Sequence, residues 1–283
     1  MNITQILSQE LSATATQITA AVELLDDGAT VPFIARYRKE ATGGLDDTQL
    51  RQLAERLQYL RELEERKAVV LKSIEEQGKL SDDLRAQIEA ADNKTALEDL
   101  YLPYKPKRRT KAQIAREHGL QPLADMLLAE QPQDVEAAAQ GYLNENVPDA
   151  KAALDGARAI LMEQFAEDAE LIGTLRDKLW NEAEIHAQVV EGKETEGEKF
   201  SDYFDHREPV RAMPSHRALA VLRGRNEGVL NIALKYQPDD TPITQQSEYE
   251  QIIARRFKVS DGHKWLRDTV RLTWRAKIFL SLE

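Results

Sequence analysis

Apolar residues recur every three or four positions between signals that start and stop helices, and this pattern constrains the fold more than any other feature of the sequence. The clearest example begins at Asp46 and Gln49, whose side chains can each satisfy the other's backbone N–H group at a helix start. Four leucines continue the spacing: Leu50, Leu53, Leu57 and Leu60. We therefore expect one long helix over residues 46–78. Because Glu64 and Lys67 interrupt the apolar stripe, packing against the chain's own helices is favoured over a coiled coil.

The same signals divide the rest of the chain into shorter helices, so the expected fold is all-α: a multi-helix assembly with at most a short strand pair. Further helices are expected at 82–91, 110–119, 149–167 and 169–190 and again between 252 and 279, with one strand at 229–236. Core candidates within the two helices of 149–190 are Ile160, Leu161, Phe165, Leu171, Leu175, Leu179, Trp180 and Ile185.

Three short helices with tight turns precede the long one, opening at Asn2 and then covering 14–25 and 33–40. This arrangement predicts a helix-turn-helix-like N-terminus. The same arrangement is common in proteins that never touch DNA, so it does not by itself assign DNA binding.

Composition excludes several classes of protein. The 283 residues include no cysteine, which rules out disulfides, a thiolate zinc site and a cysteine nucleophile. No apolar run approaches the roughly 18 residues that a membrane span needs, and the start lacks the pattern of a secretory signal. A cytoplasmic location is therefore expected. The formal net charge of −11 restricts any contact with nucleic acid to local patches.

Residues 131–150 carry acidic side chains, no basic one and two prolines, which favours a boundary between domains. We expect an N-terminal helical domain over 1–130 and a second helical region over 131–283. The last helix lacks a glycine, proline or basic residue as a stop signal, so we also expect the chain to continue in a longer protein.

Residues 101–117 reverse the charge of the chain, with six basic side chains and one acidic one. The prolines at 103 and 106 keep the segment extended and display its cations in a line that can follow a phosphate backbone. The candidate binding residues are Lys105, Lys107, Arg108, Arg109 and Lys111. The alternatives are a solvated loop, or a basic segment that docks onto acidic helices of the same protein.

Two smaller clusters are further candidates for phosphate contacts. Arg36, Arg38 and Lys39 alternate with an aromatic residue, Tyr37, as on nucleic-acid surfaces, although that tyrosine can equally pack inside. Arg223 and Arg225 lie on an arginine-rich helix. Their alternative is pairing with the acidic loop at 191–202.

The usual catalytic signatures are missing from the sequence. It contains no phosphate-binding glycine loop, dinucleotide fingerprint or nucleophile elbow. Its five histidines are scattered, and its adjacent aspartates lie at expected helix ends, where capping explains them. We therefore expect no metal, no cofactor and no enzymatic activity.

Four stretches together resemble a known family: residues 31–46, 102–111, 203–205 and 214–228. In order along the chain, they are similar to the N-terminal half of the Tex family of bacterial transcription accessory proteins. The resemblance implies a mostly helical region with a helix-turn-helix element. It also implies downstream RNase H-like, helix-hairpin-helix and OB-fold domains, the last supplying most of the nucleic-acid affinity, and none of these is in this sequence.

Two functions follow from the residues and the resemblance. In the first, the chain is part of a nucleic-acid-binding transcription accessory factor, for RNA or DNA, in which this half scaffolds the binding domains and adds phosphate contacts. In the second, it is a protein-interaction module that docks onto transcription machinery through its helical faces. The salt dependence of binding separates the two, because phosphate contacts release counterions and an apolar interface does not.

Overall fold

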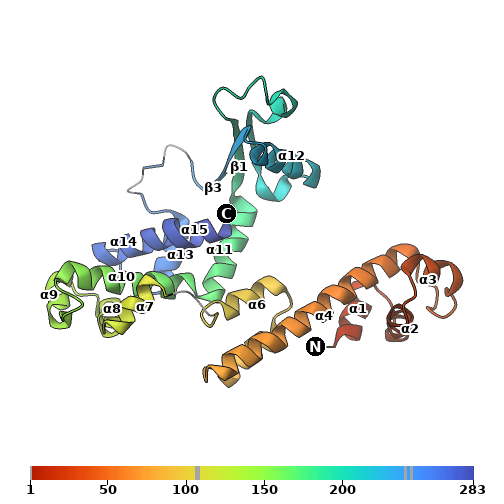
Figure 1. Cartoon of the computed structure of the whole chain (residues 1–283), viewed down its shortest axis with the longest axis horizontal. Coiled ribbons are helices and arrows are strands. Elements are labelled where there is room, and N and C mark those ends of the chain that lie inside the picture. Colours follow the sequence, from red (N-terminus) through yellow and green to blue (C-terminus); the bar gives the residue numbers. More distant parts are fainter. Residues whose placement is uncertain (1, 106–108, 239–240, 243–244) are drawn as a thin grey trace. The chain divides into compact units, whose positions relative to one another are not determined.

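A computed structural model describes residues 2–105, 109–238, 241–242 and 245–283. These residues form fifteen α-helices and one small three-stranded antiparallel sheet (Figure 1). The largely helical fold expected from the sequence is therefore confirmed. The chain divides into two compact units, Met1–Tyr104 and Lys105–Glu283. Among the described residues, no helix has both the length and the apolar character needed to cross a membrane.

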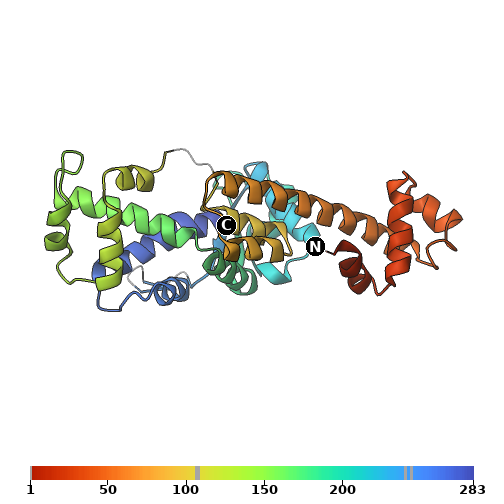
Figure 2. The same ribbon diagram turned by 90° about the horizontal axis from the view of Figure 1, so that it is seen from below.

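The first unit is built on one long helix. Its helices are α1 (Ile3–Glu10), α2 (Ala15–Asp26), α3 (Val31–Tyr37), α4 (Asp47–Glu76), α5 (Asp82–Ala90) and α6 (Lys94–Tyr101). Helix α4 starts as predicted: Asp46 Oδ1 accepts a hydrogen bond from Gln49 N at 2.8 Å, and Gln49 Oε1 accepts one from Asp46 N at 3.1 Å. The two views show α1, α2 and α3 gathered at one end of α4 (Figure 1, Figure 2).

Helix α4 contributes to two apolar clusters in succession. Its first half packs on α1, α2 and α3, with Ile18 and Ile34 fully buried, and its second half packs on α5 and α6. Lys67 is buried in the same face, where its Nζ donates to the Glu89 carbonyl at 2.8 Å and so satisfies part of its hydrogen-bonding need. Packing against the chain's own helices, the alternative favoured over a coiled coil, is confirmed.

The second unit has an apolar core around α10. Its helices are α7 (Lys111–Glu117), α8 (Gln121–Glu130), α9 (Val135–Ala139), α10 (Ala150–Ala166), α11 (Ala169–Glu182), α12 (Ser215–Asn226), α13 (Glu248–Arg256), α14 (Lys264–Thr273) and α15 (Phe279–Leu282). A π-helical turn, Trp274–Ile278, joins α14 to α15. Helices α7, α8, α9 and α14 all contact α10. In Figure 2 the ribbons of α10 (green) and α14 (blue) cross each other.

The small sheet also lies in the second unit. Its strands are β1 (Glu184–Val189), β2 (Asp205–Pro209) and β3 (Leu230–Lys235), with β1 in the centre and antiparallel to both neighbours. The predicted strand at 229–236 is confirmed. The predicted helix at 169–190 is wrong beyond residue 182, because residues 184–189 pair on both sides with segments that a local reading of the sequence cannot bring together.

The prediction that Trp180 lies in the core is also wrong. The structure leaves this residue exposed. The buried stripe of α11 runs through Leu171, Leu175 and Leu179 at four-residue spacing. Trp180 follows the last of these by one position, which turns its side chain about 100° away from the stripe.

The boundary between compact units lies after Tyr104, whereas the sequence pattern predicts a domain boundary after residue 130. Helices α7 and α8 lie between these two positions, and both share one apolar core with α10. The assignment of 1–130 and 131–283 as functional domains stays a prediction.

Candidate nucleic-acid interface

The C-terminal end of α3 and the turn after it form the first candidate surface, residues 33–44, called here the α3 tip. Ile34 fixes α3 in the core of the first unit. The following turn closes at Gly43, whose φ of +59° favours glycine and whose added Cβ would lie 2.9 Å from Gln17 Cγ. Gln17 Nε2 donates to the Gly43 carbonyl at 2.8 Å, which ties the turn to α2. The contact with α2 therefore holds this turn in place.

The three predicted cations of the α3 tip, Arg36, Arg38 and Lys39, are all exposed. Within the described part of the chain, none of them forms an ion pair. Arg38 lies over the Phe33 ring, with its guanidinium carbon 5.5 Å from the ring centroid. The turn surrounds an open hollow of about 870 Å³, lined by residues 36–41, 43 and 44. Glu40 is the one acidic residue of that lining.

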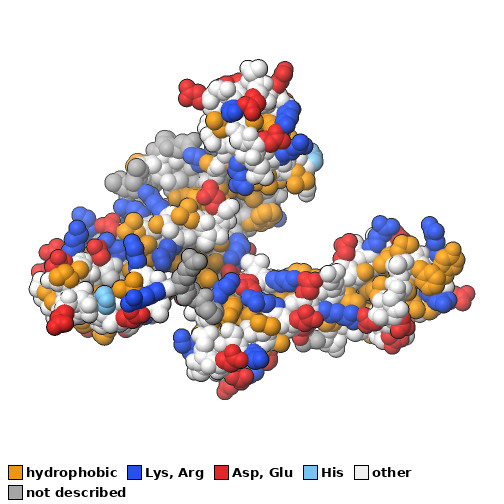
Figure 3. Space-filling view, viewed as in Figure 1, with side chains coloured by type: hydrophobic (Ala, Val, Ile, Leu, Met, Phe, Trp, Pro, Cys, Tyr) orange, Lys and Arg blue, Asp and Glu red, His pale blue; other side chains and the backbone are white. Residues whose placement is uncertain are grey.

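Two aromatic rings accompany these cations. Phe33 and Tyr37 lie one helical turn apart, with ring centroids 5.4 Å from each other, and both are exposed. In the space-filling view, hydrophobic and basic side chains meet at the end of the first unit that carries α3 (Figure 3). The alternative that Tyr37 packs inside the protein is therefore wrong. Phe33 was missed, although its i, i+4 spacing from Tyr37 was a readable signal.

The basic segment gives a different result. Lys107 and Arg108 lie outside the described residues, while Lys105, Arg109 and Lys111 are exposed. Arg109 forms an ion pair with Glu117 of α7, in which its Nε lies 3.1 Å from Glu117 Oε2. This is a local ion pair with the one acidic residue of α7, which also carries Lys111 and Arg116, so docking of the segment onto an acidic helix stays a prediction.

A buried carboxylate of α10 contacts both ends of α7. Glu163 of α10 accepts from Thr110 Oγ1 at 3.0 Å and from Arg116 Nη1 at 2.6 Å. Thr110 is also the N-cap of α7, as predicted, since its Oγ1 accepts from Gln113 N at 3.0 Å. Sequence reasoning missed Glu163 because its partners lie about 50 positions away.

On α12, the two predicted arginines differ from each other. Arg223 Nε donates to Glu227 Oε1 at 2.9 Å, and Lys199 reaches the other oxygen of Glu227 at 2.5 Å. Hydrogen bonds from Lys199 and then Arg223 lower the pKa of Glu227. The acid that Arg223 meets thus lies outside the predicted loop at 191–202. Arg225 is exposed and has no ion pair within the described residues.

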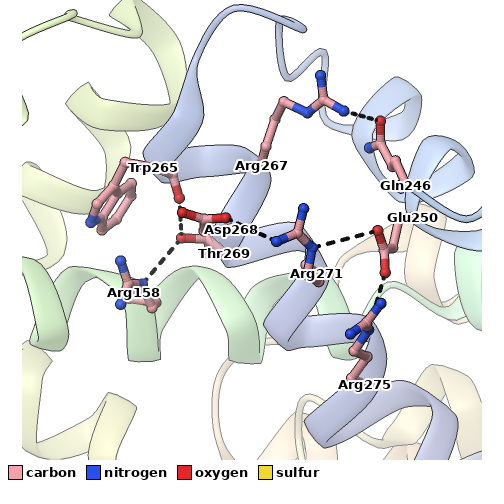
Figure 4. Close-up of polar contacts among 9 residues, drawn as sticks. All are labelled: Arg158, Gln246, Glu250, Trp265, Arg267, Asp268, Thr269, Arg271 and Arg275. Carbon is pink, nitrogen blue, oxygen red and sulfur yellow. Dashed lines mark hydrogen bonds and ion pairs between the residues drawn. The ribbon is translucent and has the colours of Figure 1, made fainter. Parts of the chain in front are cut away.

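One buried carboxylate outside these clusters has a shifted pKa. Glu250 of α13 is 1% exposed and faces two arginines, Arg275 of the π-helical turn at 3.4 Å and Arg271 of α14 at 4.0 Å (Figure 4). Burial raises the pKa of Glu250, and the two arginines oppose that rise. Arg271 also contacts Asp268 at 3.4 Å. These contacts surround the carboxylate with the protein's own cations, which suits a brace between α13 and α14.

A metal centre finds no support in the part of the chain that the structure describes, where no group of three or more His, Cys, Asp or Glu side chains is placed to hold an ion. The absence of a cofactor and of enzymatic activity stays a prediction. The candidate residues thus lie on three separate elements: α3, the start of α7, and α12.

Comparison with known proteins identifies the class of protein. A family model described as the Tex central region matches residues 130–283, and one described as the Tex-like protein N-terminal domain matches residues 1–75. The chain therefore belongs to the Tex family, as the sequence resemblance predicted.

Individual relatives agree with this assignment. The transcriptional accessory protein Tex of Neisseria gonorrhoeae is 96% identical over 283 residues, which are 100% of this chain and 37% of that protein. Protein YhgF of Escherichia coli is 56% identical, over 99% of this chain and 37% of its own length. The S1 RNA-binding domain-containing protein 1 of Pongo abelii is 30% identical over 82% of this chain and 24% of its own length. The chain thus spans 37% of the bacterial relatives just named.

Proposed function

We propose that this chain is the part of a transcription accessory factor that adds phosphate contacts to nucleic-acid binding. The observation that carries the proposal is the α3 tip, where three exposed cations have no acidic partner within the described residues. A nucleic-acid phosphate supplies the missing counter-charge, and binding releases the ions condensed on the strand. The name of the Pongo abelii relative, which refers to an S1 RNA-binding domain, is consistent with RNA as a partner.

The remaining candidates contribute unequally in this proposal. Lys111 and Arg225, which are both exposed, add phosphate contacts from the second unit. Lys105, Lys107 and Arg108 of the basic segment remain further candidates. Arg109 and Arg223 contribute less, because each already pairs with a carboxylate of its own unit. The proposal keeps a helix-turn-helix-like role for α1–α3, a scaffolding role for the rest of the chain, and a cytoplasmic location.

A salt titration with charge-reversal variants tests the proposal. The variant R36E/R38E/K39E is compared with R51E/K72E/K79E, which makes the same change in net charge with exposed cations at other positions of the first unit. Affinity for nucleic acid is measured in the intact protein between 50 and 200 mM salt. We expect the first variant to reduce the slope of log affinity against log salt by roughly 0.7 to 0.9 per lost contact, and the second to leave it unchanged. Equal slopes in the two variants contradict the proposal.

A second candidate function is docking onto transcription machinery through a helical face. The observation that favours it is the outer face of α12, where Leu219 and Leu222 are both exposed. Exposed leucines on one face of a helix suit an apolar protein interface. Replacing both with serine is expected to abolish co-purification of a transcription protein while the salt slope of nucleic-acid binding stays the same. Retained co-purification contradicts this candidate.

A further inference from the structure

The two exposed rings of the α3 tip have no role in the core. The apolar cluster that holds α3 against α4 contains Ile34, with Val31 and Ala35 packed beside it, and neither Phe33 nor Tyr37 belongs to it. The rings are 41% and 66% exposed, respectively. Exposure of two large aromatic side chains one turn apart gives up their burial energy, so the packing of this unit does not explain them.

The cations around the rings determine which ligand fits. Arg36, Arg38 and Lys39 immediately surround Tyr37 in the sequence and, with it, line the hollow of about 870 Å³. Arg38 lies over Phe33, so a guanidinium and two aromatic rings share one surface. An acidic protein segment would satisfy the cations and leave the rings in water. A strand with flat bases and a phosphate backbone satisfies both.

We propose that the α3 tip is a stacking site for unpaired bases of single-stranded nucleic acid, with Phe33 and Tyr37 as the platforms and Arg36 and Lys39 on the phosphates. This inference rests on the proposed function and deepens it. Base faces inside a duplex are already covered by their neighbours, so only unpaired bases can stack on side-chain rings. The site therefore selects single strands over duplexes, and it does so for RNA and DNA alike because both expose the same ring faces.

The test uses variants that remove the rings and keep every cation. F33A/Y37A removes both platforms, and alanine preserves the helix. F33L/Y37L keeps apolar bulk and removes only the aromatic faces. The matched control is L219A/L222A on α12, whose side chains are 67% and 41% exposed and so nearly equal to Tyr37 and Phe33 in exposure.

Affinity of the intact protein is measured for three probes: a single-stranded 12-mer, the same strand with abasic sites in place of its bases, and a blunt duplex. We expect both ring variants to lose affinity for the ordinary single strand by about 10- to 100-fold, since stacking typically contributes that much for one base. Their affinity for the abasic strand and the duplex, and the salt slope for all three probes, should match the unaltered protein. The α12 control should bind all probes normally.

A second measurement detects the contact directly, whatever other domains contribute to affinity. A single strand containing 4-thiouridine is photocrosslinked to the intact protein, and the adducts are mapped by mass spectrometry. Adducts on Phe33 or Tyr37 support the stacking site. Their absence, or an equal loss of affinity for all three probes in F33A/Y37A, overturns it. The proposed function fails separately, when the charge-reversal variant of the α3 tip leaves the salt slope unchanged.

Discussion

The α3 tip and the start of α7 both place several cations within a few residues, and they differ in what those cations meet. At the α3 tip, Arg36 and Lys39 have no acidic partner within the described residues. Around α7, Arg109 pairs with Glu117 and Arg116 with Glu163. The cations of a basic run can therefore stay exposed without a partner or pair with the protein's own carboxylates, and the position of nearby carboxylates in the fold decides between the two.

The largest effect is expected for a variant that removes Glu163, the carboxylate that holds α7 on α10. In Glu163→Ala, Thr110 Oγ1 loses its acceptor at the start of α7, and Arg116 in the last turn keeps only Gln121 among the described residues. We expect the second unit to lose about 1 to 3 kcal/mol of stability, the usual cost of leaving a buried polar group without a partner. All three tryptophans, Trp180, Trp265 and Trp274, belong to this unit, so urea unfolding followed by tryptophan fluorescence reports on it. A stability loss below about 0.5 kcal/mol, the usual scatter of surface substitutions, contradicts the brace.

The next effect compares the two basic runs directly as binding surfaces. R36E/K39E and R109E/K111E make the same charge change in the two runs. We expect R36E/K39E to reduce the salt slope of nucleic-acid binding by about 1.4 to 1.8, two contacts at 0.7 to 0.9 each. R109E/K111E should reduce it by only about 0.7 to 0.9, the share of Lys111, because Arg109 is already paired. Salt titrations of the intact protein measure both slopes. If R109E/K111E reduces the slope as much as R36E/K39E or more, the two basic runs do not differ as proposed.

The sequence predicted those parts of the fold that depend on neighbouring residues. The start of α4 follows from Asp46 and Gln49, and the start of α7 from Thr110, because a capping side chain bonds a backbone group only three positions away. It could not predict β1, whose partners at Asp205 and Leu230 come from the two sides of the sheet. Strand pairing over such distances overrides the local pattern.

The candidate site was predictable to the same extent. The exposed cations of the α3 tip could be recognised as a basic run interleaved with Tyr37. The pairing of Arg109 was left open between solvent, ligand and protein, because Glu117 meets it only once α7 has formed. Glu163 and Glu250 could not be found at all, since nothing in their local sequence marks them as buried.

In a third arrangement, Arg271 and Arg275 lie beside the buried Glu250, and here the comparison concerns how stability depends on pH. Burial raises the pKa of Glu250 in the folded protein above its ordinary value of 4.5. Between these two values the folded state binds more protons than the unfolded state, so stability falls as pH rises through that window. Each pKa unit of the rise corresponds to about 1.4 kcal/mol. Melting of the second unit is followed by tryptophan fluorescence from pH 4 to 7.

The matched variant for this measurement is Glu250→Gln, which keeps the shape of the side chain and cannot ionise. We expect its melting temperature to lack the decline that Glu250 adds to the unaltered protein above pH 4.5. Parallel profiles for the two proteins contradict the assigned direction of the pKa. The brace differs here from that at Glu163, whose carboxylate both a hydroxyl and an arginine reach within 3.0 Å.

The smallest effect on stability is expected for a variant that frees Arg109 from its ion pair, so that the basic run at α7 resembles the α3 tip. Glu117→Gln removes the charge that holds Arg109, and both side chains of this pair are well exposed to solvent. Exposed ion pairs contribute about 0.2 to 1 kcal/mol, so the melting temperature should change little. Arg109 becomes available to phosphate, and the salt slope of nucleic-acid binding should therefore rise, by at most roughly 0.7 to 0.9 for one added contact. In the double variant E117Q/R109Q the slope should return to the original value. A slope that rises equally in both variants would assign the change to the lost negative charge alone, and the pairing of Arg109 would then not be what separates the start of α7 from the α3 tip.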